Sequence, residues 1–153
     1  MIAMRKKITV IPSTYSGRGQ AGDFEWMLDQ FEYENTLFIF NDNEEQFDAF
    51  VKGESSGFTR GGGNATIRPF RKNSPPRAAG VPTGKSGRGY LSLDEPTKAK
   101  IDQALAVITD LLETDNYDSV VFSANETKTD IGTGIFDVGA DVRAYIFGRL
   151  VGM

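Results

Sequence analysis

The sequence contains neither cysteine nor histidine among its 153 residues. The absence of cysteine excludes disulfides, thiolate metal sites and cysteine nucleophiles. The absence of histidine removes the commonest general base, the commonest transition-metal ligand and every catalytic pair that couples a serine or a cysteine to an imidazole. Any chemistry must therefore use carboxylates, lysine, arginine, hydroxyls, amides or the backbone, and we expect no metal and no other cofactor.

Long apolar runs are missing as well. The N-terminal segment carries charge and then only a short apolar run, Ile8 to Ile11, whereas a membrane span needs roughly 20 apolar residues. We therefore expect no leader, no membrane partner and a cytoplasmic location. The 153 residues are 39% hydrophobic and 25% charged, which is typical of a single globular domain.

The charge of the chain is unevenly distributed. The formal net charge is −4, but residues 53–90 hold seven basic residues and one acidic residue, so this segment sums to +6 and the remainder to −10. The same segment holds nine of the 17 glycines and four of the six prolines. We expect a long basic loop within the domain. It is either a solvated, partly disordered insertion or a region that binds anions through arginine and glycine-rich backbone.

Short apolar runs alternate with amphipathic stretches along the rest of the chain. Strands are predicted at 7–11, 36–40 and 118–123, with a further short one at 65–68. Helices are predicted at 24–31, 44–51, 97–113 and 139–150. Asp23 can cap the first of them, and Ser92 to Glu95 has the capping-box pattern ahead of the third. Residues 131–136 fit either a strand or a loop. The alternation predicts an α/β domain with a mostly parallel central sheet flanked by helices, a Rossmann-like three-layer arrangement.

Polar residues follow three of the predicted strands. Ligands bind beyond the carboxyl ends of the strands in open α/β sheets, so these residues are candidates for a site. Turn chemistry explains each set singly, but three sets on one edge beside a basic loop favour a ligand site. The residues are Ser13, Thr14, Asn41, Asp42, Asn43, Asn125 and Glu126.

Two glycine motifs accompany them, Gly61-Gly62-Gly63-Asn64 and Gly132-Thr133-Gly134. Without Cβ atoms, such backbone can bring its N–H groups close to an anion, although flexible linkers also contain these runs. Gly84-Lys85-Ser86 is similar to the end of a P-loop. However, the preceding Gly80 is one residue too close and we expect no apolar strand before it, so a P-loop is not predicted.

The order of these motifs resembles that of macrodomains, the α/β modules that bind ADP-ribose. The similar pieces are Phe38 to Asn43, Gly61 to Ile67, and Ile131 to Phe136. The resemblance implies a macrodomain-like variant of the three-layer fold. The chain is also similar in kind to small phage and bacterial proteins.

The resemblance also implies roles for individual residues. Asn41 and Asn43 would lie near the distal ribose, and Asp42 would accept a hydrogen bond from adenine or ribose. Gly61 to Asn64 would contact ribose and phosphate, and Gly132 to Phe136 would wrap the diphosphate.

The leading prediction is a binding module for a nucleotide-type anion such as ADP-ribose, an NAD-derived signal or a cyclic nucleotide. Arg68, Arg71 and Arg77 would contact phosphate, and the two glycine motifs would donate backbone N–H groups. Tyr15, Phe58, Phe70 or Tyr90 would either stack on a base or pack in the core.

Two other functions remain open. One is a hydrolase acting on an ADP-ribosyl or phosphate-ester substrate, with Asp42 or Glu126 as general base and Asn41, Asn64 or Asn125 orienting water. The other is binding of nucleic acid or a partner protein through the basic loop. The −10 charge of the remainder argues against a wide nucleic-acid footprint. The oligomeric state does not follow from the sequence.

Overall fold

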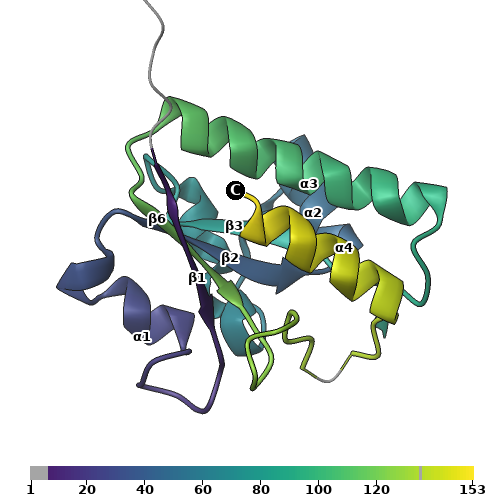
Figure 1. The fold of residues 1–153 in the computed structure, drawn as a ribbon. Coiled ribbons are helices and arrows are strands. Elements are labelled where there is room, and N and C mark those ends of the chain that lie inside the picture. The colour runs from purple at the N-terminus through teal and green to yellow at the C-terminus, as the bar shows by residue number, and fades with distance from the viewer. Residues whose placement is uncertain (1–6, 135) are drawn as a thin grey trace, which may run out of the picture.

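A computed structural model of the chain describes residues 7–134 and 136–153. Its centre is a parallel sheet with the strand order β1-β6-β2-β3 (Figure 1). The four strands are β1 (Thr9–Ser13), β2 (Thr36–Asp42), β3 (Ala78–Pro82) and β6 (Ser119–Ser123). The predicted mixed α/β class with a parallel sheet is confirmed, because every pair in this sheet is parallel.

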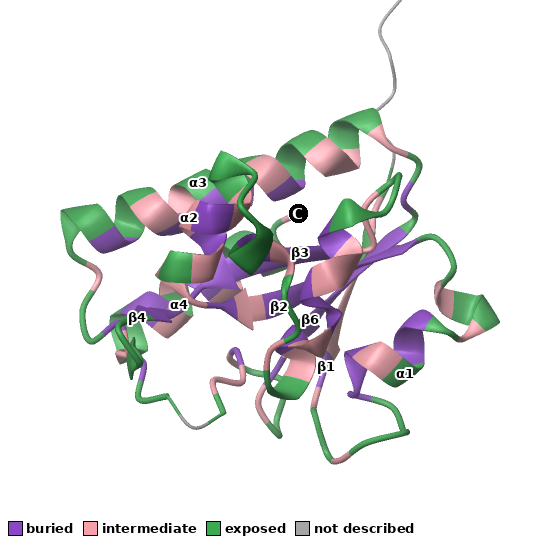
Figure 2. Ribbon diagram, turned by 180° about the vertical axis from the view of Figure 1, so that it is seen from behind, coloured by how far each residue is buried: buried purple, intermediate pink, exposed green. Residues whose placement is uncertain are grey.

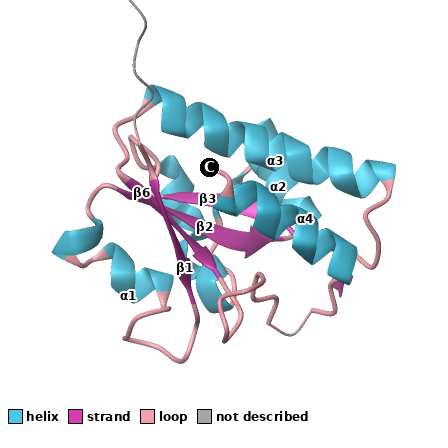
Figure 3. Ribbon diagram, in the orientation of Figure 1, coloured by secondary structure: helices cyan, strands magenta, loops and turns pink. Residues whose placement is uncertain are grey.

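Helices connect the strands (Figure 3). They are α1 (Phe24–Leu28), α2 (Glu44–Lys52), α3 (Glu95–Thr114) and α4 (Ala140–Val151), with 3-10 helices η1 (Phe31–Tyr33), η2 (Ser55–Phe58) and η3 (Gly63–Lys72). A small hairpin of β4 (Gly84–Lys85) and β5 (Arg88–Gly89) follows β3. The predicted cap at Asp23 is confirmed, since its side chain accepts the Glu25 N–H in the first turn of α1. The capping-box pattern of Ser92 to Glu95 places the cap of α3 at Ser92, but the N-cap is Asp94, whose side chain accepts the Thr97 N–H.

Alternate residues of β2 face opposite layers. Leu37 and Ile39 pack in a core that includes residues of α3 and α4, whereas Phe38 and Phe40 pack in a second core with residues of α1 and η3. Strands β2, β3 and β6 are accordingly buried along most of their length, whereas the edge strand β1 is mostly half-buried (Figure 2). This period of two produces the three layers: α3 and α4, the sheet, and α1 with η3.

The segment 53–90, expected as one long loop, contains regular structure. Residues 65–68 lie in η3, so the strand predicted there is wrong. The β-branched pair Thr66-Ile67 suggested extended backbone, but Ala65, Arg68 and Arg71 are buried at intervals of three, the spacing that aligns side chains along a 3-10 helix.

The sheet gains its fourth strand, β3, from the same segment. Its sequence, Ala-Ala-Gly-Val-Pro, is poor in the branched and aromatic residues that mark strands, so it was not predicted. A small residue is required at Gly80, because a Cβ there would lie 2.7 Å from Asp42 Oδ2. Of residues 131–136, the described ones lie in a loop with a bridge between Ala124 and Ile131, and Ile135 lies outside the described residues.

Candidate functional site

The carboxyl edge of the sheet brings many of the predicted polar residues together. Asn64 lies at its centre: its Oδ1 accepts the Phe24 N–H at 2.9 Å, and its Nδ2 donates to the Gly22 carbonyl and to Ser123 Oγ, both at 3.1 Å. The Ser13 hydroxyl is buried against the sulfur of Met27. The polar groups of Asn64 and Ser13 are therefore used within the protein, where they hold η3 and α1 to the ends of the strands.

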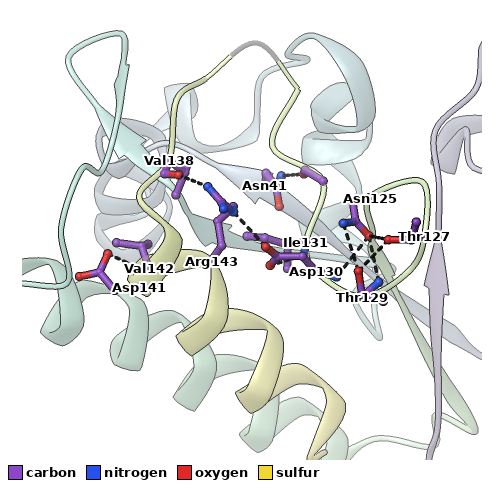
Figure 4. Close-up of polar contacts among 11 residues, drawn as sticks. Asn41, Asn125, Thr127, Thr129, Asp130, Ile131, Val138, Asp141, Val142 and Arg143 are labelled. Carbon is purple, nitrogen blue, oxygen red and sulfur yellow. Dashed lines mark hydrogen bonds and ion pairs between the residues drawn. The ribbon is translucent and has the colours of Figure 1, made fainter.

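The loop after β6 is fastened by side chains in the same way (Figure 4). Thr14 Oγ1 donates to the Asn125 carbonyl at 2.7 Å, and Asn125 Oδ1 accepts the N–H groups of Thr129 and Asp130 at 2.9 and 3.2 Å. Arg143 of α4 donates its Nε to Asp130 at 2.9 Å. These contacts join the loop after β6 to the end of β1 and to α4.

Asn41 and Asn43, at the end of β2, have different roles. Asn41 Nδ2 donates to the Gly132 carbonyl, so the end of β2 and the second glycine motif are adjacent (Figure 4). Asn43 caps α2, because its Oδ1 accepts the Gln46 N–H at 2.9 Å.

The glycines of the two motifs lie in different surroundings. A Cβ on Gly61 would come within 2.7 Å of Arg68 Nη1, and one on Gly132 within 2.7 Å of the Ala124 carbonyl oxygen. These two glycines allow close packing of the protein against itself. Gly62, Gly63 and Gly134 face open space, and Thr133 accepts the Phe136 N–H through its carbonyl.

Asp42 is the centre of a buried ion cluster. Arg68 donates to Asp42 Oδ1 through Nε at 3.3 Å and Nη2 at 3.0 Å, and Arg71 contacts Oδ2 through Nη2. The side chains of Asp42, Arg68 and Arg71 are 0%, 5% and 1% exposed. Burial lowers the pKa of both guanidinium groups. Arg68 and Arg71 were predicted to bind a phosphate. Their guanidinium groups contact the buried carboxylate of Asp42 instead.

Most of the remaining positive charge of segment 53–90 is also engaged. Arg77 donates to the carbonyls of Thr36, Leu28 and Tyr33. Arg60 pairs with Glu25, and Lys72 lies 4.8 Å from the Phe58 ring centre. Within the described part of the chain, no carboxylate lies within 4.0 Å of the charged groups of Lys85 and Arg88. Among the described residues, the segment's cations with neither an ion pair nor one of these other contacts therefore lie at the β4–β5 hairpin. Lys85 still has an acidic neighbour at longer range, because its charge, after the hydrogen bonds from Thr97, helps to lower the pKa of Asp94.

Lys85 and Arg88 line a hollow of about 230 Å³ between the hairpin and the N-terminus of α2. We call this the hairpin hollow. Its walls are Asp42, Asn43, Glu45, Gln46, Gly84, Lys85, Gly87, Arg88 and Phe136. The Glu45 carboxylate accepts the Ser86 N–H and so joins α2 to the hairpin. Tyr90, just after the hairpin, donates to Glu44 at 2.8 Å.

The turn of the hairpin is unusual. Ser86 and Gly87 have φ of 53° and 74°, which is the pattern of a type I′ turn. Glycine adopts this conformation freely, whereas serine does so at a cost. The turn presents Lys85 and Arg88 from neighbouring positions of the two short strands, where they are paired in register.

The hairpin hollow lies where two connections diverge. After β2 the chain enters α2 and then η3, which packs on one face of the sheet. After β3 it passes through the hairpin to α3 on the other face. Crevices of this kind are the usual ligand sites of open α/β sheets. Sequence reasoning identified the edge and Asn43, but it missed Gln46, Gly87 and Arg88.

The chemistry available for hydrolysis is limited. Both oxygens of Asp42 are held by arginine, and Oδ1 also accepts the Asn43 N–H at 2.9 Å, so this carboxylate is poorly placed to accept a substrate proton. Glu126 is exposed in the loop after β6. Among residues 7–134 and 136–153, no cluster of three or more carboxylates is arranged to hold a metal ion.

The predicted aromatic stacking residues have mixed surroundings. Tyr90 is buried, and Phe58 and Phe70 pack on other apolar groups, Phe58 against Phe50. Tyr15 is 44% exposed. Phe136 is 39% exposed and borders the hairpin hollow. It lies in the loop of the second glycine motif.

Comparison with known protein families, curated proteins and solved structures found no match. In the described part of the chain, no helix is both long enough and apolar enough to cross a membrane.

Proposed function

We propose that this protein binds a nucleotide-type anionic ligand, with the phosphate in the hairpin hollow. The observation that carries the proposal is the convergence of Lys85 and Arg88, both without an ion pair among the described residues, on a hollow at the N-terminus of α2. Lysine and arginine are the side chains that bind phosphate, and the first N–H groups of a helix add further donors.

The charges around the hollow favour an anion. Lys85 and Arg88 contribute two positive charges and Glu45 one negative charge, so the walls sum to +1 once Asp42 is counted with its own arginine partners. Glu45 is also directed to Ser86 of the hairpin. The macrodomain-like order of motifs is consistent with the same class of ligand.

The volume of the hollow limits what it encloses. At about 230 Å³, it is smaller than the roughly 300–1,000 Å³ of pockets that enclose a drug-sized ligand. It therefore suits the phosphate end of a nucleotide, with the base lying outside. Phe136 at the rim offers a ring on which a base can stack.

The test is a titration of the protein with ADP-ribose, AMP, cyclic nucleotides and inorganic phosphate, followed by thermal unfolding and calorimetry. A ligand present at 100 times its Kd stabilises the fold by about 2.7 kcal/mol, which raises the Tm by about 5–11 °C in a chain of this size. No shift with any member of this panel would overturn the proposal.

Matched variants locate the site. A hydrogen bond to a charged group contributes about 1.5–3 kcal/mol, so Lys85→Gln and Arg88→Gln should each weaken binding by about 10- to 100-fold. Lys52→Gln is the control, because Lys52 is an exposed lysine at the opposite end of α2. Equal losses in all three variants would show that binding depends on net charge alone.

A further inference from the structure

Arg71 has hydrogen-bond donors that the protein leaves unused. Its Nη2 contacts Asp42, but Nε and Nη1 are buried and have no hydrogen-bond partner among the described residues. The side chain is 1% exposed. Buried polar groups are nearly always hydrogen-bonded, so unused donors on a buried charge need an explanation.

The buried cluster also carries excess charge. Arg68 and Arg71 bring two positive charges and Asp42 brings one negative charge, so the cluster sums to +1. Burial lowers the pKa of Arg71 to about 9, which still leaves the group cationic at neutral pH. Its guanidinium carbon lies 4.9 Å from the Phe40 ring centre and 4.6 Å from that of Phe50, and ring faces offset only part of a positive charge.

A cavity adjoins this guanidinium. It has a volume of about 90 Å³ and, apart from Arg71, its walls are apolar side chains and glycine. Most of these walls come from α2, β3 and α3, and Pro76 comes from the segment before β3. They are Phe47, Phe50, Pro76, Ala78, Ala79, Gly80, Val107 and Leu111. We call it the Arg71 cavity. None of these walls supplies a carboxylate or another side-chain acceptor.

We infer that the Arg71 cavity is a binding site for a small monoanion. Its single negative charge would balance the cluster, and an acceptor atom would take a buried N–H of Arg71. One water occupies about 30 Å³ in the liquid, so the cavity has room for a halide ion or for a carboxylate with a short apolar chain. The chain would pack against Phe47, Phe50 and Leu111.

This site is separate from the hairpin hollow. Of the residues that line the two spaces, none is shared. Loss of nucleotide binding in Lys85→Gln would therefore leave the Arg71 cavity intact, and each proposal can fail without the other.

The experiment measures thermal unfolding of the whole chain in sodium propionate, sodium chloride and propionamide, with ionic strength held constant by sodium sulfate. We expect a saturable rise in Tm with propionate or chloride, and the more effective probe identifies the kind of anion. Propionamide, which has nearly the same shape without the charge, should give no rise. No saturable rise with either anion, or an equal rise with propionamide, would overturn the inference.

A cavity-filling variant tests whether the anion that raises the Tm binds in the Arg71 cavity. Val107→Phe adds volume to the α3 wall without changing Arg71, and it should reduce the Tm response to the anion by at least half. Val151→Phe is the control, since Val151 is half-exposed on α4 and does not line the cavity. An undiminished response in Val107→Phe would place the anion elsewhere.

A spectroscopic readout is independent of stability. In ¹⁵N-labelled protein, the Arg71 Nε–H resonance should shift progressively as propionate or chloride is added and stop shifting at saturation. The Arg149 Nε–H resonance serves as reference, because that side chain is about half exposed on α4. A shift of both resonances in parallel would indicate a general salt effect and overturn the inference.

Discussion

Replacing Asp42 by asparagine should strongly destabilise this fold. The variant keeps the size of the side chain and removes the negative charge that Arg68 and Arg71 both contact. Both guanidinium groups would remain where they are, because η3 positions them from the backbone. They would then be two buried positive charges with no counter-ion among the residues around them.

The magnitude follows from burial. The three side chains are 0%, 5% and 1% exposed, so water screens the cluster very little. Removing one partner from a buried pair costs about 3–5 kcal/mol, a large part of the roughly 5–15 kcal/mol that stabilises a typical domain. At roughly 2–4 °C per kcal/mol, the Tm should fall by about 6–20 °C.

The assay is urea-induced unfolding, followed by circular dichroism and by the fluorescence of the single tryptophan, Trp26. Asp48→Asn is the matched control, because Asp48 pairs with Lys100 on the surface and its side chain is 36% exposed. Surface pairs contribute about 0–1 kcal/mol, so this control should change stability by less than 1 kcal/mol.

A loss of less than about 1 kcal/mol in Asp42→Asn would refute the reasoning, since it would mean that water reaches the cluster. A triple variant separates charge from packing. Asp42→Leu combined with Arg68→Met and Arg71→Met removes all three charges at similar volume, and it should recover most of the loss.

Three further predictions use the same unfolding assay. Gly80→Ala should cost about 1–3 kcal/mol, because its Cβ would lie 2.7 Å from Asp42 Oδ2. In contrast, Gly62→Ala, which meets open space, should be neutral or slightly stabilising. Asn64→Ala should cost about 1–3 kcal/mol, because it leaves the Phe24 N–H without its acceptor, and Asn64→Asp, which keeps that acceptor, should cost less. Burial raises the pKa of Tyr117 to about 12, with Asp115 adding to the rise. The folded chain therefore holds this proton above the unfolded pKa of about 10, and stability should fall as the pH rises from about 10 towards 12. Tyr117→Phe should reduce that fall between roughly pH 10 and pH 12; identical pH profiles would contradict the assignment.

In segment 53–90, the partners of the arginines could not be predicted from the sequence. Its excess of arginine was visible, but the same composition fits a solvated loop, a phosphate site or a set of internal ion pairs. The difference depends on whether each arginine meets an acid or a carbonyl from a distant part of the chain. Arg68 and Arg71 meet Asp42 more than 25 residues away, and Arg77 meets carbonyls more than 40 residues away.

The candidate site was located in part. The rule that ligands bind beyond the carboxyl ends of parallel strands pointed to the edge at which the hairpin hollow lies, and Asn41, Asn43 and the second glycine motif lie there. The hairpin was missed because β3 was missed: its alanines, glycine and proline carry almost no strand propensity. The pattern Gly-Lys-Ser-Gly-Arg at 84–88 was available, and Ser-Gly is a turn pair.

The sequence by itself determined the class of fold, because local apolar patterns specify buried strands and amphipathic helices without reference to distant residues. It also determined which chemistry is absent, since a residue type that is missing cannot act. The tertiary structure alone decided which charges are free. Pairing between distant residues buried the arginines that sequence reasoning had assigned to phosphate, and it left Lys85 and Arg88 at the hollow and the unused donors of Arg71 at the cavity.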